Sequence, residues 1–85
     1  MQLGHFDYRV VRAIEALASE ATSFKMLDRL EKELEMSVNP GHMFRVLDNL
    51  CKAKFVQATS NQPVLFALTP KGLQAASRYR ASLSG

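Results

Sequence analysis

Three polar side chains in the middle of the chain recur at intervals that place them on one side of a helix. His42, Arg45 and Asn49 are three and four residues apart, which is the spacing of neighbours on a helical face. An arginine can donate two hydrogen bonds to O6 and N7 of guanine, and an asparagine can pair its amide group with adenine. A histidine can contact a base edge or a phosphate. The trio predicts a nucleic-acid contact; the alternative is that each side chain is ordinary solvated surface.

Other residues could fix this trio on a polyanion. Asn39 precedes Pro40, and we expect its side chain to cap a helix there, although a residue at a helix entrance can also touch a phosphate. Lys25 and Lys52 would neutralise the phosphate backbone, with a solvated surface role as the equal alternative.

The remaining reactive side chains do not form an enzyme site. Cys51 and His42 are nine residues apart on one predicted helix, or about 13 Å along its axis, which is too far for a nucleophile and its base. Together with His5 they also lack the spacing of metal ligands. The chain has no glycine-rich phosphate loop. We expect no enzymatic activity, no cofactor and no metal.

Length, charge and cysteine usage limit the class of protein. The chain has 85 residues, so we expect one domain over residues 1–85. A single cysteine fits a reducing, cytoplasmic setting, and no segment resembles a signal peptide or a membrane span. The net charge is +3, and positive charge is concentrated at 37–57 (+2) and 70–85 (+3). This distribution permits a polyanion as partner.

The pattern along the chain predicts four helices and a hairpin. The first helix begins near Asp7, with an apolar stripe of Val10, Ile14, Leu17, Ala18 and Ala21. A connection at 20–23 leads to a second helix, capped by Thr22 or Ser23, whose apolar face is Leu27, Leu30 and Leu34.

The second half of the chain continues this order. The third helix runs from Pro40 to about Ala53, with Met43, Val46, Leu47 and Leu50 on its inner face and His42, Arg45, Asp48, Asn49 and Lys52 on its outer face. Short strands at 55–59 and 64–68 flank a turn at 60–63. A fourth helix begins after Thr69, with a weaker stripe of Leu73, Ala76 and Leu83. Helix, helix, helix, hairpin, helix is the order of a mainly α winged helix-turn-helix, in which the third helix enters the DNA major groove.

Several motifs in this order resemble the PadR-like winged-helix transcriptional regulators, from about Val10 to Ser82. Asn39-Pro40-Gly41-His42-Met43-Phe44 stands where the family has Ser-Pro-Gly-Thr-Leu-Tyr. The segment 66–72, FALTPKG, matches the family's Tyr-x-Leu-Thr-x-x-Gly. Ser23-Phe24 replaces a usual Gly-Tyr, Lys54 replaces a usual glycine, and the wing at 59–64 carries no Lys or Arg.

The resemblance implies sequence-specific binding of double-stranded DNA by a transcriptional regulator that is a homodimer. It implies contacts from the opening of the third helix, although Phe44 lacks the family's tyrosine hydroxyl and could pack instead. The predicted DNA-binding residues are Lys25, Asn39, Gly41, His42, Phe44, Arg45, Asn49 and Lys52. Larger members continue into helices that form the dimer and, in some, a ligand pocket. We expect no small-molecule effector here, and the first and fourth helices with Phe6, Tyr8 and Tyr79 remain for pairing.

Two other functions fit the same elements. A winged helix can be a protein–protein interaction module that does not bind DNA, and the neutral wing and modest net charge favour that alternative. The chain could also be a phage or plasmid accessory DNA-binding protein. The sequence specifies neither an operator nor the direction of regulation.

Overall fold

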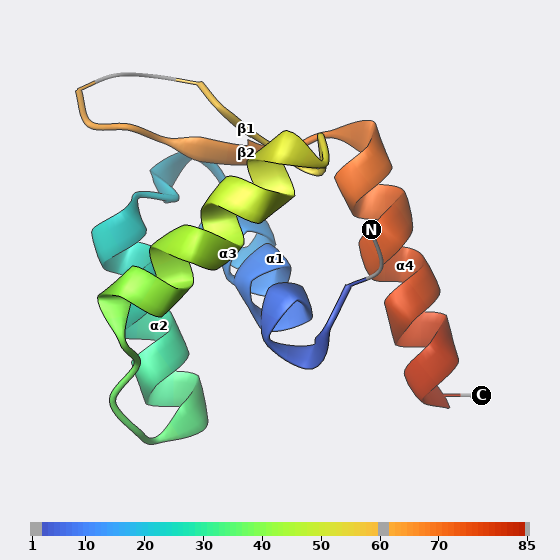
Figure 1. Ribbon diagram of the computed structural model, residues 1–85, viewed down its shortest axis with the longest axis horizontal. Helices are drawn as coiled ribbons and strands as arrows, with labels where there is room; N and C mark the ends of the chain where they lie inside the picture. Colours follow the sequence, from blue (N-terminus) through green and yellow to red (C-terminus); the bar gives the residue numbers. More distant parts are fainter. Residues whose placement is uncertain (1–2, 60–61, 85) are drawn as a thin grey trace.

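The computed structural model describes residues 3–59 and 62–84. In chain order the elements are helices α1 (His5–Leu17), α2 (Ser23–Leu34) and α3 (Pro40–Lys52), strands β1 (Val56–Ala58) and β2 (Phe66–Leu68), and helix α4 (Pro70–Ser84), with a 3₁₀ turn at Ala18–Glu20. The predicted order of three helices, a hairpin and a fourth helix is confirmed. Figure 1 shows α3 crossing in front of α1, with α2 and α4 on either side.

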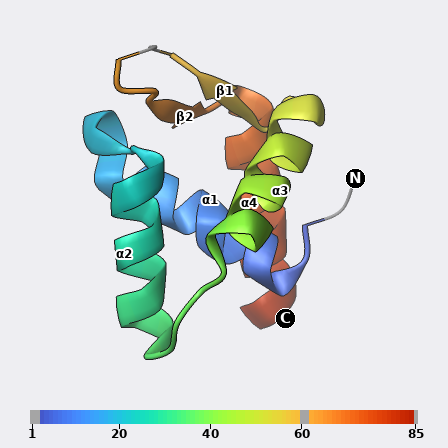
Figure 2. The ribbon, with the colours of Figure 1, turned by 60° about the vertical axis from the view of Figure 1, so that its left-hand side comes forward.

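Helix α1 is the centre of the core. Its buried side chains are Tyr8, Val10, Val11, Ala13 and Ile14, and it contacts α2, α3, α4 and β2. The turned view in Figure 2 likewise places α1 between α2 and α4. The rest of the buried cluster comes from Met26 and Leu30 of α2, four side chains of α3, Ala76 of α4, and Ala21, Val38, Phe55 and Val56. The helices and the hairpin therefore pack around one hydrophobic core.

The two ends of α1 differ from the prediction. The helix begins at His5, and Asp7 is its third residue; the Asp7 carboxylate accepts the N–H of the N-cap residue Gly4 at 2.8 Å. The helix ends at Leu17 because Ala18 adopts a positive φ of 52°. Ala18 is therefore exposed and is not part of an apolar stripe, whereas Ala21 is buried in the connection that follows.

The caps of α2 and α3 follow the sequence. The Thr22 hydroxyl accepts the N–H of Lys25 at 3.2 Å, which identifies Thr22 as the N-cap of α2. Asn39 is the N-cap of α3, and Pro40 is the first helical residue. All four residues of the predicted inner face of α3 are buried: Met43, Val46, Leu47 and Leu50.

The hairpin is antiparallel and is anchored to the helices. Gln57 pairs with Ala67 at its centre, and the N–H of Phe66 donates to the carbonyl of Ala21 at 2.9 Å. β2 is thus fixed to the α1–α2 connection. Of the predicted turn, Ser60 and Asn61 lie outside the described residues.

The hairpin leads into α4 through a close backbone contact. A Cβ atom on Gly72 would lie 2.1 Å from the carbonyl oxygen of Phe55, so only glycine fits there. The Thr69 hydroxyl accepts the Gly72 N–H at 3.0 Å, and the Lys71 ammonium donates to the carbonyl of Ala53 at 3.1 Å. The glycine of the Leu-Thr-x-x-Gly motif therefore lets the start of α4 lie against the chain that leaves α3.

The predicted apolar stripe of α4 is mostly wrong. Ala76 is buried, but Leu73 and Leu83 are 48 % and 61 % exposed. The side chains that meet the core are instead Ala75 and Tyr79, beside Ala76. The stripe was misassigned because α4 has few large apolar residues to mark its inner face. No helix in residues 3–59 and 62–84 is long and apolar enough to cross a membrane.

Candidate nucleic-acid interface

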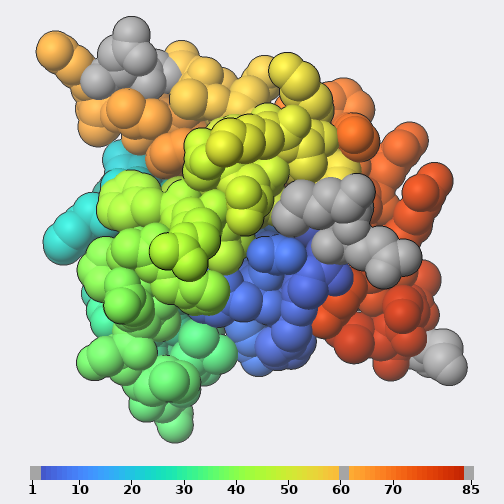
Figure 3. Space-filling model, viewed as in Figure 1, coloured from blue at the N-terminus to red at the C-terminus, as the bar shows by residue number. Residues whose placement is uncertain are grey.

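Helix α3 lies at the surface with its polar face outward. The space-filling view in Figure 3 shows α3 as a diagonal ridge across the front of the molecule. The five side chains predicted for the outer face are all exposed: His42, Arg45, Asp48, Asn49 and Lys52. The helix therefore has the two faces that a recognition helix needs, one holding it to the core and one left for a partner.

Arg45 and Asn49 are the most available side chains of this face. Neither forms a hydrogen bond or an ion pair with any residue that the structure describes. They are four residues apart and therefore lie on adjacent turns. A guanidinium without an internal partner keeps all its donors for an outside acceptor.

His42 is exposed but is held from one side. Its ring lies 4.8 Å from the ring of Phe6, centroid to centroid, with the planes tilted by 46°. Phe6 is the second residue of α1, so this contact orients the imidazole toward the α1 edge of the α3 face. The sequence did not predict this contact because 36 residues separate the two rings.

The polar groups at the N-terminus of α3 form hydrogen bonds with one another. The Asn39 side-chain oxygen accepts the N–H of Gly41 at 2.8 Å and that of His42 at 3.4 Å. The capping role predicted for Asn39 is therefore confirmed. Gly41 is exposed, and its N–H is already satisfied by that cap.

The two lysines predicted to contact phosphate both form ion pairs at the surface. Lys25 lies 3.3 Å from Glu20, and Lys52 lies 2.9 Å from Asp48. The hydrogen bond to Asp48 and the charge of that carboxylate raise the pKa of Lys52. Exposed ion pairs of this kind are weak, so each lysine remains able to contact a phosphate.

Phe44 does not pack into the core. Its side chain is 51 % exposed on α3, and Phe24, at the start of α2, is 79 % exposed. The packing alternative for Phe44 is therefore wrong, and the aromatic ring lies at the surface of α3.

The aromatic residues expected to serve pairing are already used within the chain. Tyr8 and Tyr79 lie 4.5 Å apart, centroid to centroid. The Tyr8 hydroxyl accepts from Arg80 at 3.0 Å, and the Tyr79 hydroxyl lies 3.2 Å from Nδ1 of His5. These contacts hold α4 against α1.

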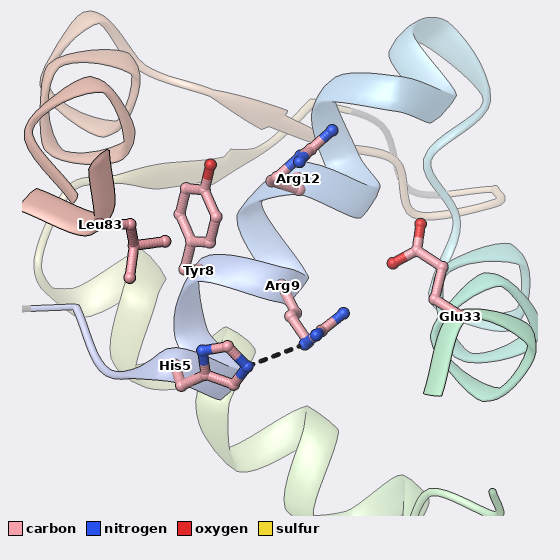
Figure 4. Close-up of a pocket in the computed structure, with 6 residues that line it drawn as sticks. All are labelled: His5, Tyr8, Arg9, Arg12, Glu33 and Leu83. Atoms are coloured by element: carbon pink, nitrogen blue, oxygen red, sulfur yellow. Dashed lines mark hydrogen bonds between the residues drawn. The ribbon is translucent and has the colours of Figure 1, made fainter. Parts of the chain in front are cut away.

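A second surface feature lies away from α3. A hollow of about 410 Å³ is lined from α1, α2 and α4 by His5, Tyr8, Arg9, Arg12, Glu33 and Leu83. In Figure 4 the arginines of α1 face Glu33 across the hollow, and the dashed line marks the 3.2 Å hydrogen bond from Nε of Arg9 to Nε2 of His5. Its charges are mixed, so it does not extend the positive character of the α3 face.

The metal-ligating side chains and the single cysteine are dispersed in the part of the chain that the structure describes. Residues 3–59 and 62–84 contain no group of three His, Cys, Asp or Glu side chains able to hold a metal ion. Cys51 is half-buried at the edge of the core, and burial, with a smaller effect of the Asp48 charge, raises the pKa of its thiol. A raised pKa leaves less thiolate and makes Cys51 a poor nucleophile.

Three solved structures share this fold over 96 % of the chain. A complex structure of hsRosR-S1 is 22 % identical, with a TM-score of 0.83 and 74 % of its own length covered. A complex structure of hsRosR-S4 is 23 % identical, with a TM-score of 0.79 and 72 % covered. RosR of H. salinarum, grown from NaBr, is 22 % identical, with a TM-score of 0.82 and 76 % covered. The fold is a winged helix.

At this level of identity the likeness establishes the fold. No protein-family model matches the sequence, and no curated protein matches it. In this fold α3 occupies the position of the recognition helix of a helix-turn-helix, and the β1–β2 hairpin occupies the position of the wing.

Proposed function

We propose that the chain binds double-stranded DNA in a sequence-specific manner, with α3 in the major groove, and acts as a transcriptional regulator. The observation that carries the proposal is the outer face of α3, where Arg45 is exposed and has no partner among the described residues. An arginine in this position on a recognition helix can donate two hydrogen bonds to guanine. The winged-helix fold shared with RosR, two of whose structures are complexes, supports the proposal.

Phosphate contacts would set the register of α3 on the duplex. Lys25 would exchange its Glu20 partner for a phosphate, and Lys52, in the last turn of α3, would reach a phosphate while it still offsets the charge of Asp48. Asn39 and Gly41 would act by building the start of α3, and His42, Asn49 and Phe44 would lie at the groove edges. Each phosphate neutralised adds to the salt dependence of binding.

The assembly and setting that we propose rest on the sequence. We propose one winged-helix domain over residues 1–85, similar to the PadR-like regulators, working in the cytoplasm as a homodimer without a cofactor. The exposed Leu73 and Leu83 of α4 are apolar surface that a second copy could cover. A two-fold dimer would require half-sites about 34 Å apart, or one helical turn of DNA.

One observation favours the alternative of a protein-interaction module. Phe24 is 79 % exposed, and large exposed aromatic side chains are common in protein interfaces. Such a module would not bind DNA, and Phe24→Ala would abolish binding of its protein partner.

Selection from a randomised duplex library tests the proposal. The protein should enrich a common site, and Arg45→Ala should lose discrimination at one G·C pair by about 1–3 kcal/mol. Arg78→Ala is the matched control, because it removes the same charge from an exposed arginine on α4. Failure to enrich any duplex would exclude sequence-specific binding, and equal weakening on all duplexes would make Arg45 a phosphate contact.

A further inference from the structure

The outer face of α3 carries one acidic side chain among its cations. Asp48 is the only Asp or Glu in Pro40–Lys52, and its side chain is 61 % exposed. Arg45 precedes it by three residues and Lys52 follows it by four, so all three lie along the outward side of the helix. A carboxylate that faces a polyanion weakens binding to every sequence unless it has a partner on the DNA.

The ion pair with Lys52 leaves this carboxylate able to accept another hydrogen bond. One oxygen, Oδ2, lies 2.9 Å from the Lys52 ammonium. The other oxygen has no hydrogen-bond partner within residues 3–59 and 62–84. Lys52 therefore offsets the charge of Asp48 and leaves an acceptor facing outward.

The position along α3 suits an adjacent base step. Three helical residues rise about 4.5 Å, and successive bases of one DNA strand are about 3.4 Å apart. A base contacted by Asp48 would therefore neighbour the base contacted by Arg45. Lys52 lies about 6 Å further along the axis, where a long side chain can reach the phosphate backbone.

The chemistry of a carboxylate selects the base. An ionised carboxylate only accepts hydrogen bonds. In the major groove guanine presents acceptors alone and thymine presents an acceptor and a methyl group, whereas cytosine presents its N4 amino donor. Adenine places its N6 donor beside the N7 acceptor, which would face the carboxylate unfavourably.

We propose that Asp48 is a specificity-determining residue that accepts a hydrogen bond from the N4 amino group of cytosine, one base step from the base contacted by Arg45. This inference rests on the proposed function. It gives the target site a chemical description: a guanine and a cytosine on neighbouring base pairs in each half-site, read by side chains of opposite charge.

A purely structural role for Asp48 makes a different prediction. The Asp48–Lys52 pair has the i, i+4 geometry that stabilises isolated helices. Asp28 and Lys32 form the same pair on α2, at 3.0 Å, with side chains 55 % and 77 % exposed. Asp28→Ala therefore removes an equivalent charge and an equivalent ion pair, and is the matched control for Asp48→Ala.

The test measures affinities for the duplex that the wild-type chain enriches and for a panel with each base pair replaced in turn. Asp28→Ala should change all affinities by one common factor. Asp48→Ala should strengthen binding to duplexes without the cytosine and lose about tenfold of the preference for that one C·G pair. Asp48→Asn should shift the preference there toward adenine, because an amide can pair with N6 and N7.

The outcomes separate the two proposals. If Asp48→Ala changes every affinity by the same factor, as Asp28→Ala does, Asp48 reads no base and the inference is wrong. If the wild-type chain enriches no duplex at all, the proposed function itself fails, and the inference falls with it.

Discussion

Replacing Lys54 by glycine should stabilise the fold. Lys54 follows α3 with φ at 68°, and its N–H donates to the carbonyl of Cys51 while that of Phe55 donates to Leu50, both at 3.0 Å. This is the Schellman arrangement, in which glycine is favoured because it has no Cβ. A side chain in the left-handed region costs about 1–2 kcal/mol, and the extra flexibility of unfolded glycine costs about 0.5–1 kcal/mol. Lys54→Gly should therefore raise the free energy of unfolding by about 0.5–1 kcal/mol.

Thermal and urea unfolding, followed by circular dichroism, would measure this change. A domain of this size gains about 4–8 °C in Tm per kcal/mol, so Lys54→Gly should melt about 2–8 °C higher. Lys54→Ala removes the charge and keeps the Cβ atom, and should leave the Tm close to the wild-type value. If the alanine variant gains as much as the glycine variant, the lysine charge is the cause, and the reasoning from φ is refuted.

Three further predictions concern single positions. Gly72→Ala should lower the free energy of unfolding, measured in urea, by about 3 kcal/mol or more, because its Cβ would lie 2.1 Å from the backbone of Phe55. A change below about 1 kcal/mol would mean that the contact relaxes easily. Asn39→Ala removes the N-cap of α3 and should lower the free energy of unfolding by about 0.5–2 kcal/mol. An unchanged unfolding midpoint would show that the cap does not stabilise the fold. Cys51 should react with iodoacetamide more slowly in the native chain than in urea near pH 8.5, since burial and the Asp48 charge raise its thiol pKa; equal rates would contradict that. The same raised pKa contributes stability that is present below the thiol pKa of the unfolded chain and is lost as pH rises through the folded one.

The sequence predicts best where one residue decides a local geometry. Asn39 and Pro40 determine the start of α3, and the structure confirms both. The inner face of α3 follows from its periodicity, because four large apolar residues recur at helical spacing. Lys54 stands where the PadR-like pattern has a glycine, and its positive φ of 68° shows why glycine is favoured at that position.

The sequence predicts less well where contacts join distant parts of the chain. The stacking of Phe6 on His42 and the approach of Gly72 to Phe55 depend on how the helices pack. No spacing along the chain encodes them. The ion pair of Lys52 with Asp48 could be predicted from the sequence, because the two residues are four positions apart on one helix.

The pattern also fails where apolar residues are few. The Leu73 and Leu83 side chains of α4 are exposed, and its inner face is built by the smaller Ala75 and Ala76 with Tyr79. Large apolar residues normally mark the buried face, so a helix that buries alanines is easily misassigned. The sequence predicts the start of α1 two residues too late because Asp7, which accepts the N–H of the N-cap residue, lies inside the helix.

The measurement that tests the central claim most directly is fluorescence anisotropy with two labelled duplexes, the one enriched by the protein and a shuffled duplex of the same composition, at about 50 mM and about 200 mM salt. Sequence-specific binding through α3 predicts that the enriched duplex binds at least about a thousandfold more tightly than the shuffled one, with affinity falling as salt rises. Equal affinity for both duplexes, or no binding to either at low salt, would contradict the account.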